Sequence, residues 1–460
     1  MSGAMRRVVM KFGGTSVGVA ANFAHAVALA ADRAVRDERP PIVVVSALTG
    51  VTNLLVEWCA LPSRRVALAA RFVSRHEEFA AATGLGPGPL ESLLSRWREA
   101  AAALAGEAAV HGAARDGVLA FGERCAAALF AAGLAARGVA ARAIVAGDAG
   151  LVTDERFGAA HPLPESAARL ASALGPLREV AVVTGFLGVT LDGRTTTLGR
   201  GGSDFSAAIV GAAVGADEIQ IWTDTSGLLS ADPRVVPEAR PVPRLSFAEA
   251  SELAYFGAKV LHPKTLQPAM ERGIPVRILN TARPDDPGSV ITAAAGPADA
   301  PWRVKSIASR SGVTAVTIVS TRMLAAHGFL ARVFEVFGRH HLVVDLVTTS
   351  EVSISVTLDD VARLDEALAE LEGIGRVEVR GGLAIVAVVG EGAPERIGLA
   401  GHVFTLLGGV GIGVEMISQG ASRVNLSFVV READSDRAVR LLHRGLGLDA
   451  EAPAPARAAN

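Results

Sequence analysis

The glycine-rich stretch at residues 193–204, GRTTTLGRGGSD, constrains the fold of this chain more than any other feature. It follows a valine-rich apolar run that predicts a buried strand ending at Gly185, and it precedes FSAAIVGAAVGA, which predicts a helix packed on a sheet. Glycines let the backbone approach a ligand, and the start of the following helix presents N–H groups without partners. The stretch indicates an anion site suited to phosphate, although glycine-rich turns are common in α/β proteins and a purely structural role stays open.

Length, charge and cysteine content narrow the class of protein. A chain of 460 residues is too long for one core and predicts two or three domains. The net charge of −2 offers no basic stripe for nucleic acid, and no apolar run approaches the roughly 20 residues that span a bilayer. Cys59 and Cys125 form no C-x-x-C motif, so neither a disulfide framework nor a zinc site is expected. We therefore expect a cytoplasmic protein that binds neither nucleic acid nor membrane.

Lysine is scarce in this chain, which makes each lysine informative. Only four of the 45 basic residues are lysine, namely Lys11, Lys259, Lys264 and Lys305. A lysine ammonium is a compact point charge that a guanidinium cannot imitate beside a crowded phosphate. Lys11 and Lys259 are therefore candidates for phosphate binding, whereas an ordinary surface position is the main expectation for Lys264 and Lys305.

The first 135 residues place polar groups at predicted strand ends. Residues 8–18, VVMKFGGTSVG, predict a strand ending near Lys11, a Gly-Gly turn and a helix start, but they lack the Walker pattern. Residues 41–53 predict a second buried strand that leads to Thr52. Ligands gather at such carboxyl ends in open α/β sheets, while helix capping is the alternative role for the hydroxyl. Glu123 stands alone in an apolar helical stretch, where a surface position and a buried, partnered position are both open.

The chain changes character near residue 295. Before that point, predicted strands such as 219–222 alternate with helices, which indicates a mainly parallel sheet covered on both faces. The stretch PDDPGS, residues 284–289, predicts a linker at the end of this domain. Beyond it lies an internal repeat with a spacing of seventy residues, which predicts two copies of one helix-strand-strand unit. The repeat pairs Val333, Phe334, Gly338, Val344 and Asp345 with Val403, Phe404, Gly408, Val414 and Glu415.

Taken together, KFGGTSVG, GRTTTLGRGGSD, WTD, DPRV and FGAKVLHP resemble the signature motifs of the aspartate kinase family, in order across nearly the whole chain. The chain looks most like the monofunctional, lysine-inhibited class. The resemblance implies a carbamate-kinase-like amino-acid-kinase domain at residues 1–295, two α+β ACT domains at 305–380 and 381–448, and a disordered tail at 449–460. It also implies transfer of the ATP γ-phosphate to the side-chain carboxylate of L-aspartate, the first step of lysine, threonine and methionine biosynthesis.

The resemblance also assigns site residues. Lys11 and Asp204 match the catalytic lysine and organising aspartate. The aspartate-binding positions are Thr52, Glu123, Arg200 and Ser203, with Glu123 expected to meet the α-amino group and Arg200 a carboxylate. The ATP-binding positions are Lys11, Gly13, Gly14, Thr223, Asp224, Leu229, Arg234, Lys259 and Val260. The lysine-inhibitor positions in the first ACT copy are Met323, Ala326, Phe329, Leu330, Val344, Asp345, Ser350 and Glu351.

Three positions depart from the family pattern. Leu229 replaces a tyrosine near the nucleotide, Phe121 stands where histidine is common, and Ala326 replaces a hydroxyl at the inhibitor site. The acidic pair Asp345 and Glu351 still suits a cationic amino acid such as L-lysine. The corresponding positions of the second copy lack this pattern, so an effector is expected in the first copy only.

The chemistry implied by the resemblance needs no general base, because a side-chain carboxylate with a pKa of about 3.9 is ionised at neutral pH. The barrier is repulsion between anions, which Lys11, Lys259 and a Mg²⁺ ion brought with ATP would offset. Two other functions stay open from the residues alone: a kinase of the same fold with another acceptor, and an amino-acid sensor with an inactive kinase half. ACT domains commonly pair across subunits, so a homodimer or a dimer of dimers is expected.

Overall fold

The computed structural model describes residues 7–257, 263–294, 296, 302–323, 327–419 and 423–449. These residues form two compact units. The first contains most of the chain up to Ala295, and the second contains the remainder together with two stretches from within the first part. Each unit is described by itself in the following paragraphs.

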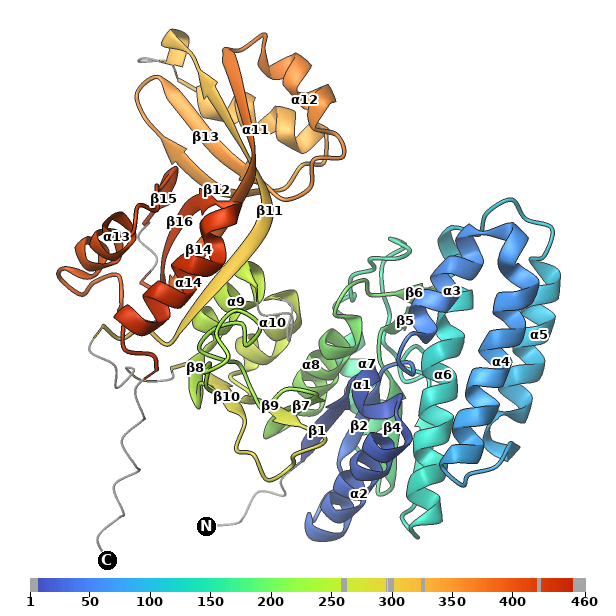
Figure 1. Ribbon diagram of the computed structural model, residues 1–460. Helices are drawn as coiled ribbons and strands as arrows, with labels where there is room; N and C mark the ends of the chain where they lie inside the picture. The colour runs from blue at the N-terminus through green and yellow to red at the C-terminus, as the bar shows by residue number, and fades with distance from the viewer. Residues whose placement is uncertain are drawn as a thin grey trace, which may run out of the picture. The chain divides into compact units, whose positions relative to one another are not determined.

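The first unit is built on an eight-stranded sheet (Figure 1). All neighbouring strands run parallel except β9 and β10, which confirms the expectation of a mainly parallel sheet. In spatial order the strands are β3 (Ala141–Ile144), β4 (Val180–Thr184), β2 (Ile42–Val45), β1 (Val8–Phe12), β7 (Glu218–Thr223), β9 (Val276–Asn280), β10 (Ser289–Thr292) and β8 (Arg244–Ser246).

Helices cover this sheet, and side chains alternate between its faces. On β1, Val8, Met10 and Phe12 join the core formed with α2 and α6, so the intervening Lys11 belongs to the opposite face. Helix α8 packs on β1, β2 and β7, and it carries Asp204 in its first turn. The pleat of β1 therefore directs Lys11 toward α8. The helices of this unit are α1 (Gly14–Val17), α2 (Ala20–Arg36), α3 (Val51–Ala60), α4 (Arg65–Ala82), α5 (Glu91–Ala103), α6 (Gly112–Ala136), α7 (Ser166–Leu174), α8 (Gly202–Val214) and α10 (Pro263–Arg272), with short 3₁₀ turns η1 (Pro62–Arg64) and η2 (Gly88–Leu90).

Helix α6 is longer and more apolar than the sequence analysis anticipated. By length and composition its 25 residues could cross a membrane, but 72% of its most apolar window is buried. It packs against α2, α3 and α5 and against β3 and β4. Two of its buried residues, Asp116 and Glu123, are carboxylic acids. Helix α6 is thus a central packing element of the first unit.

Two local predictions for the first unit were wrong. The stretch at 193–204 is not a loop throughout, because Thr195–Thr197 form strand β6, which pairs with β5 (Leu187–Val189) in a small hairpin. Three consecutive β-branched residues favour such a strand. The segment PDDPGS does not end the domain, because it connects β9 to β10 within the large sheet.

The second unit contains a six-stranded antiparallel sheet built from two similar halves. Helices α11 and α13 begin seventy residues apart, and each follows a glycine with positive φ, Gly328 at 74° and Gly398 at 92°. The predicted repeat is therefore present in the fold. The elements are β11 (Ser306–Val319), η3 (Thr321–Met323), α11 (Phe329–Arg339), β12 (Val344–Thr349), β13 (Ser353–Leu358), α12 (Leu364–Leu371), β14 (Arg376–Val389), α13 (Leu399–Gly409), β15 (Met416–Ser418), β16 (Asn425–Arg431) and α14 (Glu432–Gly445).

The two long strands β11 and β14 are shared by both halves. The register of their pairing shifts around Val313, next to Gly312, which has a φ of 77°. On one side of the shift, Ile307 packs in the core of the second copy, whereas Val316 and Ile318 on the other side pack in the core of the first copy. The second copy thus takes one of its strand segments, residues 306–311, from the chain that precedes the first copy. A contiguous division at 380 and 381 does not capture this exchange.

The boundary between the units also differs from a single cut at residue 295. Residues 229–242 and 248–258 cluster with the second unit, although the chain on both sides of them belongs to the first. Helix α9 (Phe247–Phe256) contributes Glu249, which accepts a hydrogen bond from Lys305 at 2.8 Å. Lys305 is buried, so the expected surface position was wrong. The predicted tail lies outside the described residues except for Asp449.

Candidate active site

A cavity of about 780 Å³ opens in the first unit at the carboxyl ends of β1, β2 and β7. Ligand sites of open α/β sheets occupy this position. Ten residues named in the sequence analysis line the cavity, although they are spread over more than 200 positions of the chain. They are Lys11, Gly13, Gly14, Thr52, Glu123, Arg200, Ser203, Asp204, Thr223 and Asp224.

Lys11 and Asp204 form an ion pair in this cavity. The Nζ atom of Lys11 lies 2.7 Å from Oδ1 of Asp204, and the two side chains are only 10% and 14% exposed. A pair so far removed from water holds both charges in one geometry. Gly13 also belongs to this arrangement, because a Cβ atom at that position would lie 3.3 Å from the Lys11 amine. The ammonium group is therefore fixed beside the turn that follows β1.

The glycine loop leads into α8 as the sequence predicts. Gly201 is the N-cap of α8 with a φ of 72°, a left-handed conformation that favours glycine, and no side chain caps this end of the helix. Gly202, Ser203 and Asp204 of the first turn line the same cavity, and the N–H of Gly202 donates a hydrogen bond to the carbonyl oxygen of Gly199 at 3.0 Å. The partly positive end of a helix is suited to an anion.

Glu123 lines the same cavity and is buried. Of the two positions that the sequence left open, the structure therefore shows the buried one. The Oε1 atom of Glu123 accepts a hydrogen bond from the backbone N–H of Ala47 at 3.2 Å, and its Oε2 has no partner among the described residues. Burial raises the pKa of the Glu123 carboxyl to about 8. A buried carboxylic acid with one free oxygen is suited to a cationic group of a ligand.

The sequence analysis missed Asp116, a buried residue of α6 that accepts hydrogen bonds from two segments of the cavity wall. Its Oδ2 accepts hydrogen bonds from the backbone N–H groups of Gly158 at 2.8 Å and Thr197 at 2.7 Å, and both of these residues line the cavity. Asp116 is fully buried, and burial raises the pKa of its carboxyl. It lies seven residues before Glu123 on α6, which places both carboxyl groups on one side of the helix. The spacing of seven residues between these two carboxylates is the sequence feature that could have identified Asp116.

The turn after β2 is tied to the turn after β1. The hydroxyl of Thr49 donates a hydrogen bond to the carbonyl oxygen of Gly14 at 2.7 Å. Gly18 permits this approach, since a Cβ atom there would lie 2.4 Å from the backbone nitrogen of Thr49. Both turns contribute to the cavity wall, and Asn53 and Arg115 are further lining residues that the sequence analysis did not name.

Four predicted nucleotide positions are not among the lining residues of this cavity. Lys259 and Val260 lie outside the described residues, so their roles stay predictions. Leu229 and Arg234 belong to the second unit. There the guanidinium of Arg234 pairs with Asp232, and the carbonyl oxygen of Leu229 accepts a hydrogen bond from Ser306.

The predicted effector residues lie in the first copy of the second unit, apart from Ala326, which lies outside the described residues. Phe329 belongs to the core of that copy, against which Met323 and Val344 pack. Leu330 is exposed on α11, and Ser350 and Glu351 form the exposed turn between β12 and β13.

Asp345, the remaining predicted effector residue, already has two partners within the second unit. The hydroxyl of Tyr255 donates a hydrogen bond to its Oδ1, and Nη1 of Arg310 lies 3.5 Å from the same oxygen. The second copy repeats the ion pair seventy residues later, between Arg380 and Glu415. The repeat thus extends from apolar positions to a matched charge pair.

Comparison with known proteins agrees with this geometry. Residues 6–280 match the model of the amino acid kinase family, and residues 386–446 match a model of the ACT domain. The chain is 38% identical to the lysine-sensitive aspartokinase 3 of Escherichia coli, over 95% of this chain and 99% of that protein. It is also 38% identical to the chloroplastic aspartokinase 1 of Arabidopsis thaliana, over 95% of this chain and 79% of that protein.

Solved structures give the same result. The crystal structure of E. coli aspartokinase III with aspartate and ADP, in its R-state, matches with a TM-score of 0.81 and 35% identity over 95% of this chain and 99% of that chain. The T-state structure of the same enzyme with lysine and aspartate matches with a TM-score of 0.76 and 36% identity over the same shares of the two chains. From its catalytic fold, its ACT domain and its relatives, the chain belongs to the aspartokinases of the amino acid kinase family.

Proposed function

We propose that the cavity of the first unit binds ATP and L-aspartate side by side and that Lys11 promotes transfer of the γ-phosphate to the aspartate side chain, giving 4-phospho-L-aspartate. The Lys11–Asp204 pair carries this proposal, because it fixes a compact cation at the carboxyl end of β1, beside the glycine turn and the start of α8. A fixed cation stabilises the negative charge of the transferring group without reorganising during the reaction.

The acceptor needs no base in this mechanism. A carboxylate oxygen of aspartate forms the new bond to the γ-phosphorus, the bond from that phosphorus to the bridging oxygen breaks, and ADP leaves with the electron pair. Positioning and charge neutralisation provide the acceleration. Asp204 accordingly acts as the positioning partner of Lys11, since its carboxylate already forms an ion pair with the ammonium group.

Glu123 and Arg200 would fix the two ends of the substrate. The free Oε2 of Glu123 is assigned to the α-ammonium group of aspartate, and the guanidinium of Arg200 is assigned to a carboxylate. Thr52 and Ser203 offer hydroxyl groups from the starts of α3 and α8. Cationic and anionic recognition groups in one cavity match a zwitterionic amino acid with an additional acidic side chain.

The nucleotide is assigned to the glycine turn and to the end of β7. Gly13, Gly14, Thr223 and Asp224 line the cavity there, and Leu229, Arg234, Lys259 and Val260 are proposed to complete the site. Mg²⁺ supplies further neutralisation of the phosphate charge. No cluster of three metal-ligating side chains occurs among the described residues. Asp204 and Asp224 are the carboxylates of the cavity that would be available to an ion bound with the ATP phosphates.

We further propose that L-lysine inhibits the enzyme by binding to the first ACT copy. Support comes from the acidic residues Asp345 and Glu351, which suit a cationic amino acid, and from the lysine-sensitive E. coli relative. Inhibition requires that lysine binds a less active conformation more tightly than the active one. The enzyme would then supply phosphorylated aspartate for lysine, threonine and methionine biosynthesis in the cytoplasm, under control by one end product.

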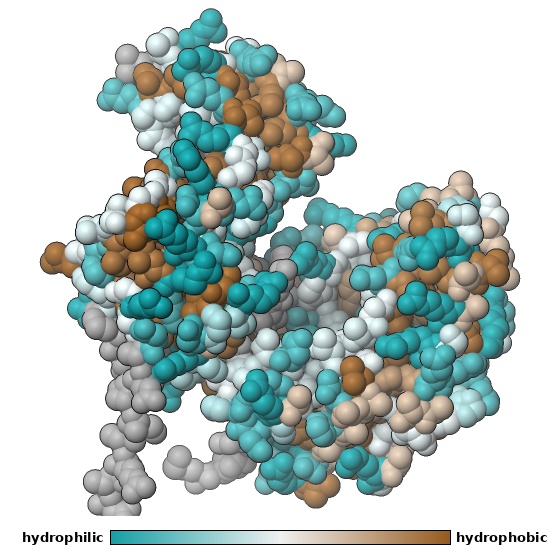
Figure 2. Space-filling view, in the orientation of Figure 1, coloured by the Kyte–Doolittle hydropathy of each residue, from teal (hydrophilic) through white to brown (hydrophobic). Residues whose placement is uncertain are grey.

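The second unit is also the proposed site of subunit association. Apolar residues are exposed on three of its strands, namely Val347, Val379 and Ile417. In the space-filling view, patches of hydrophobic residues lie among the hydrophilic residues on the surface of this unit (Figure 2). Exposed apolar strand residues are typical of a surface that pairs with another copy, so a homodimer or a dimer of dimers is proposed.

A coupled assay that measures ADP formation tests the substrate assignment. The full-length protein is assayed with MgATP and L-aspartate, with MgATP and L-glutamate, and with MgATP alone. ADP formation that depends on aspartate supports the proposal. A preference for glutamate, or equal ADP formation without an acceptor, would contradict it.

A further inference from the structure

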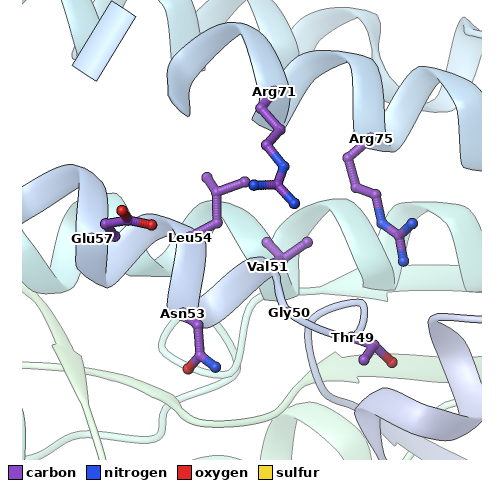
Figure 3. A pocket seen from close by; sticks show the side chains of 8 residues that line it. All are labelled: Thr49, Gly50, Val51, Asn53, Leu54, Glu57, Arg71 and Arg75. Carbon is purple, nitrogen blue, oxygen red and sulfur yellow. The ribbon is translucent and has the colours of Figure 1, made fainter. Parts of the chain in front are cut away.

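A second cavity, of about 400 Å³, adjoins the substrate cavity within the first unit. Figure 3 shows two arginine side chains that extend from α4 toward the beginning of α3. The two cavities share Thr49, Gly50 and Asn53, so one short turn forms a wall of both. The complete lining comprises Thr49, Gly50, Val51, Asn53, Leu54, Glu57, Arg71 and Arg75.

Arg71 and Arg75 give this cavity an unbalanced positive charge. They lie four residues apart on α4, hence on one side of the helix, where like charges repel each other. Neither has a carboxylate partner among the described residues; the one recorded contact is from Arg75 Nη2 to the carbonyl oxygen of Gly18, at 3.3 Å. The only acidic lining residue, Glu57, is already paired with Arg64 and lies apart from both guanidinium groups (Figure 3).

Several other exposed arginines of this unit are neutralised locally. Arg98 pairs with Glu77, Arg142 with Glu179 and Arg156 with Asp154. Arg71 and Arg75 are two neighbouring arginines that lack a carboxylate partner within the described part of the chain and line one concave surface. Together they offer forked hydrogen-bond donors to a carboxylate or phosphate group.

The opposite wall is also favourable to an anion. Helix α3 begins at Val51 after Gly50, which has a φ of 80° and provides no capping side chain. The ten-residue helix thus presents its partly positive end at the turn shared by the two cavities. We propose that this cavity is a second anion site, which takes a small dianion bearing carboxylate or phosphate groups between the two guanidinium groups and the beginning of α3.

The site has a direct connection to the substrate cavity. Thr49 lines both cavities and bonds to Gly14, while Arg75 bonds to Gly18 at the other end of α1. An anion that engages Arg75 would therefore act on one end of α1, whose other end, Gly14, belongs to the glycine turn beside Lys11. The anion site itself rests on this geometry alone and does not depend on the proposed catalytic roles.

Calorimetric titration of the full-length protein tests the site, with inorganic phosphate and succinate as separate probes. A non-hydrolysable ATP analogue and Mg²⁺ are kept saturating, so that phosphate does not enter the nucleotide site. The wild-type protein is expected to bind at least one probe, and Arg71→Gln/Arg75→Gln is expected to weaken that binding by about tenfold or more for each charged hydrogen bond removed. Binding of phosphate alone or of succinate alone would identify the group that is recognised.

Two further variants keep the result interpretable. Arg98→Gln/Arg142→Gln removes the same charge from exposed arginines outside both cavities and should leave the affinity unchanged. Arg71→Lys/Arg75→Lys keeps the charge without the planar fork and should give an intermediate affinity. The proposal is overturned if the wild type binds neither probe, or if Arg71→Gln/Arg75→Gln retains wild-type affinity.

Discussion

The amine of Lys11 at the end of β1 lies 2.7 Å from the carboxylate of Asp204 in the first turn of α8. The two residues lie 193 positions apart in the sequence, yet both side chains are largely shielded from solvent. The pair joins the two glycine motifs of the chain into one site. It also defines which substitutions should affect catalysis and which should affect only stability.

Lys11→Ala should lower kcat by about a hundredfold or more, the usual scale for loss of a fixed electrostatic stabiliser. Arg98→Ala, which removes an exposed charge from α5, serves as the control and should leave kcat unchanged. Steady-state assays with MgATP and aspartate measure both. Turnover by Lys11→Ala near that of the wild type would remove Lys11 from the mechanism.

Aspartate binding should release a proton near pH 7. Burial raises the pKa of Glu123 to about 8, so the empty site holds a neutral carboxyl at neutral pH. An ammonium group beside it favours the ionised form and lowers that pKa. Calorimetry in buffers of different ionisation enthalpy detects the released proton. The release should disappear in Glu123→Gln, and a buffer-independent heat for the wild type would contradict the assignment.

The raised pKa of Glu123 also predicts how the stability of the unliganded protein depends on pH. A carboxyl whose pKa in the folded state exceeds its unfolded value contributes stability at low pH, which is lost as the pH rises through the folded value. The free energy of unfolding should therefore decline between about pH 4.5 and pH 8 in the wild type, relative to Glu123→Gln. Denaturant titrations of both proteins across this range measure the difference. Parallel pH profiles would show that Glu123 is not neutral in the folded state.

Asp116 should contribute to stability and substrate binding through the hydrogen bonds that it accepts, and not through its negative charge. Asp116→Ala leaves the N–H groups of Gly158 and Thr197 buried without an acceptor, which should cost about 1–3 kcal/mol for each group. The aspartate KM should rise as well, because both residues line the cavity. Asp116→Asn retains an acceptor oxygen and should stay close to the wild type in both measurements. Equal damage from the two substitutions would indicate that the charge itself is required.

His76 should make the first unit sensitive to acid. Burial lowers its pKa to about 4, so the folded protein keeps the ring neutral. A histidine with a depressed pKa contributes stability above its unfolded value of about 6.5, and this stability is lost as the pH falls toward the folded value. The stability difference between His76→Leu and the wild type should therefore change by up to roughly 3 kcal/mol between pH 7 and pH 4. His25→Leu, at an exposed position on α2, should show no such trend.

Tyr255→Phe should increase sensitivity to lysine if Asp345 is an effector ligand. The Tyr255 hydroxyl donates a hydrogen bond to the carboxylate of Asp345 in the second unit. The ammonium group of a bound lysine would have to share or displace that hydrogen bond. Loss of a hydrogen bond to a charged group corresponds to about a tenfold shift in the inhibitory lysine concentration. Arg380→Ala, which affects the equivalent pair of the second copy, should not cause this shift. Absence of inhibition by millimolar lysine in the wild type would end the regulatory proposal.

The sequence allowed most of the fold and much of the site to be predicted. Apolar runs located β1, β2, β4 and β7, and the motif positions placed ten residues that the structure brings into one cavity. Those predictions succeed because strand burial and glycine loops are specified by neighbouring residues. The sequence misread PDDPGS as a linker because proline and glycine are as typical of a turn within a sheet as of a domain boundary. The segment joins β9 to β10, and the parallel pairing of β10 with the distant β8 places it inside the sheet.

Sequence alone made Lys11 and Glu123 candidates, because lysine is scarce in this chain and Glu123 stands in an apolar stretch. Asp204 became a candidate through the resemblance of its motif to a known family. Tertiary structure decided that Asp116 supports two loops, that Lys305 is buried against Glu249, and that residues 306–311 complete the second copy. Each of these depends on contacts between segments far apart in the chain. Burial and hydrogen-bond geometry, which control the charge state of a carboxyl, arise only when those segments meet.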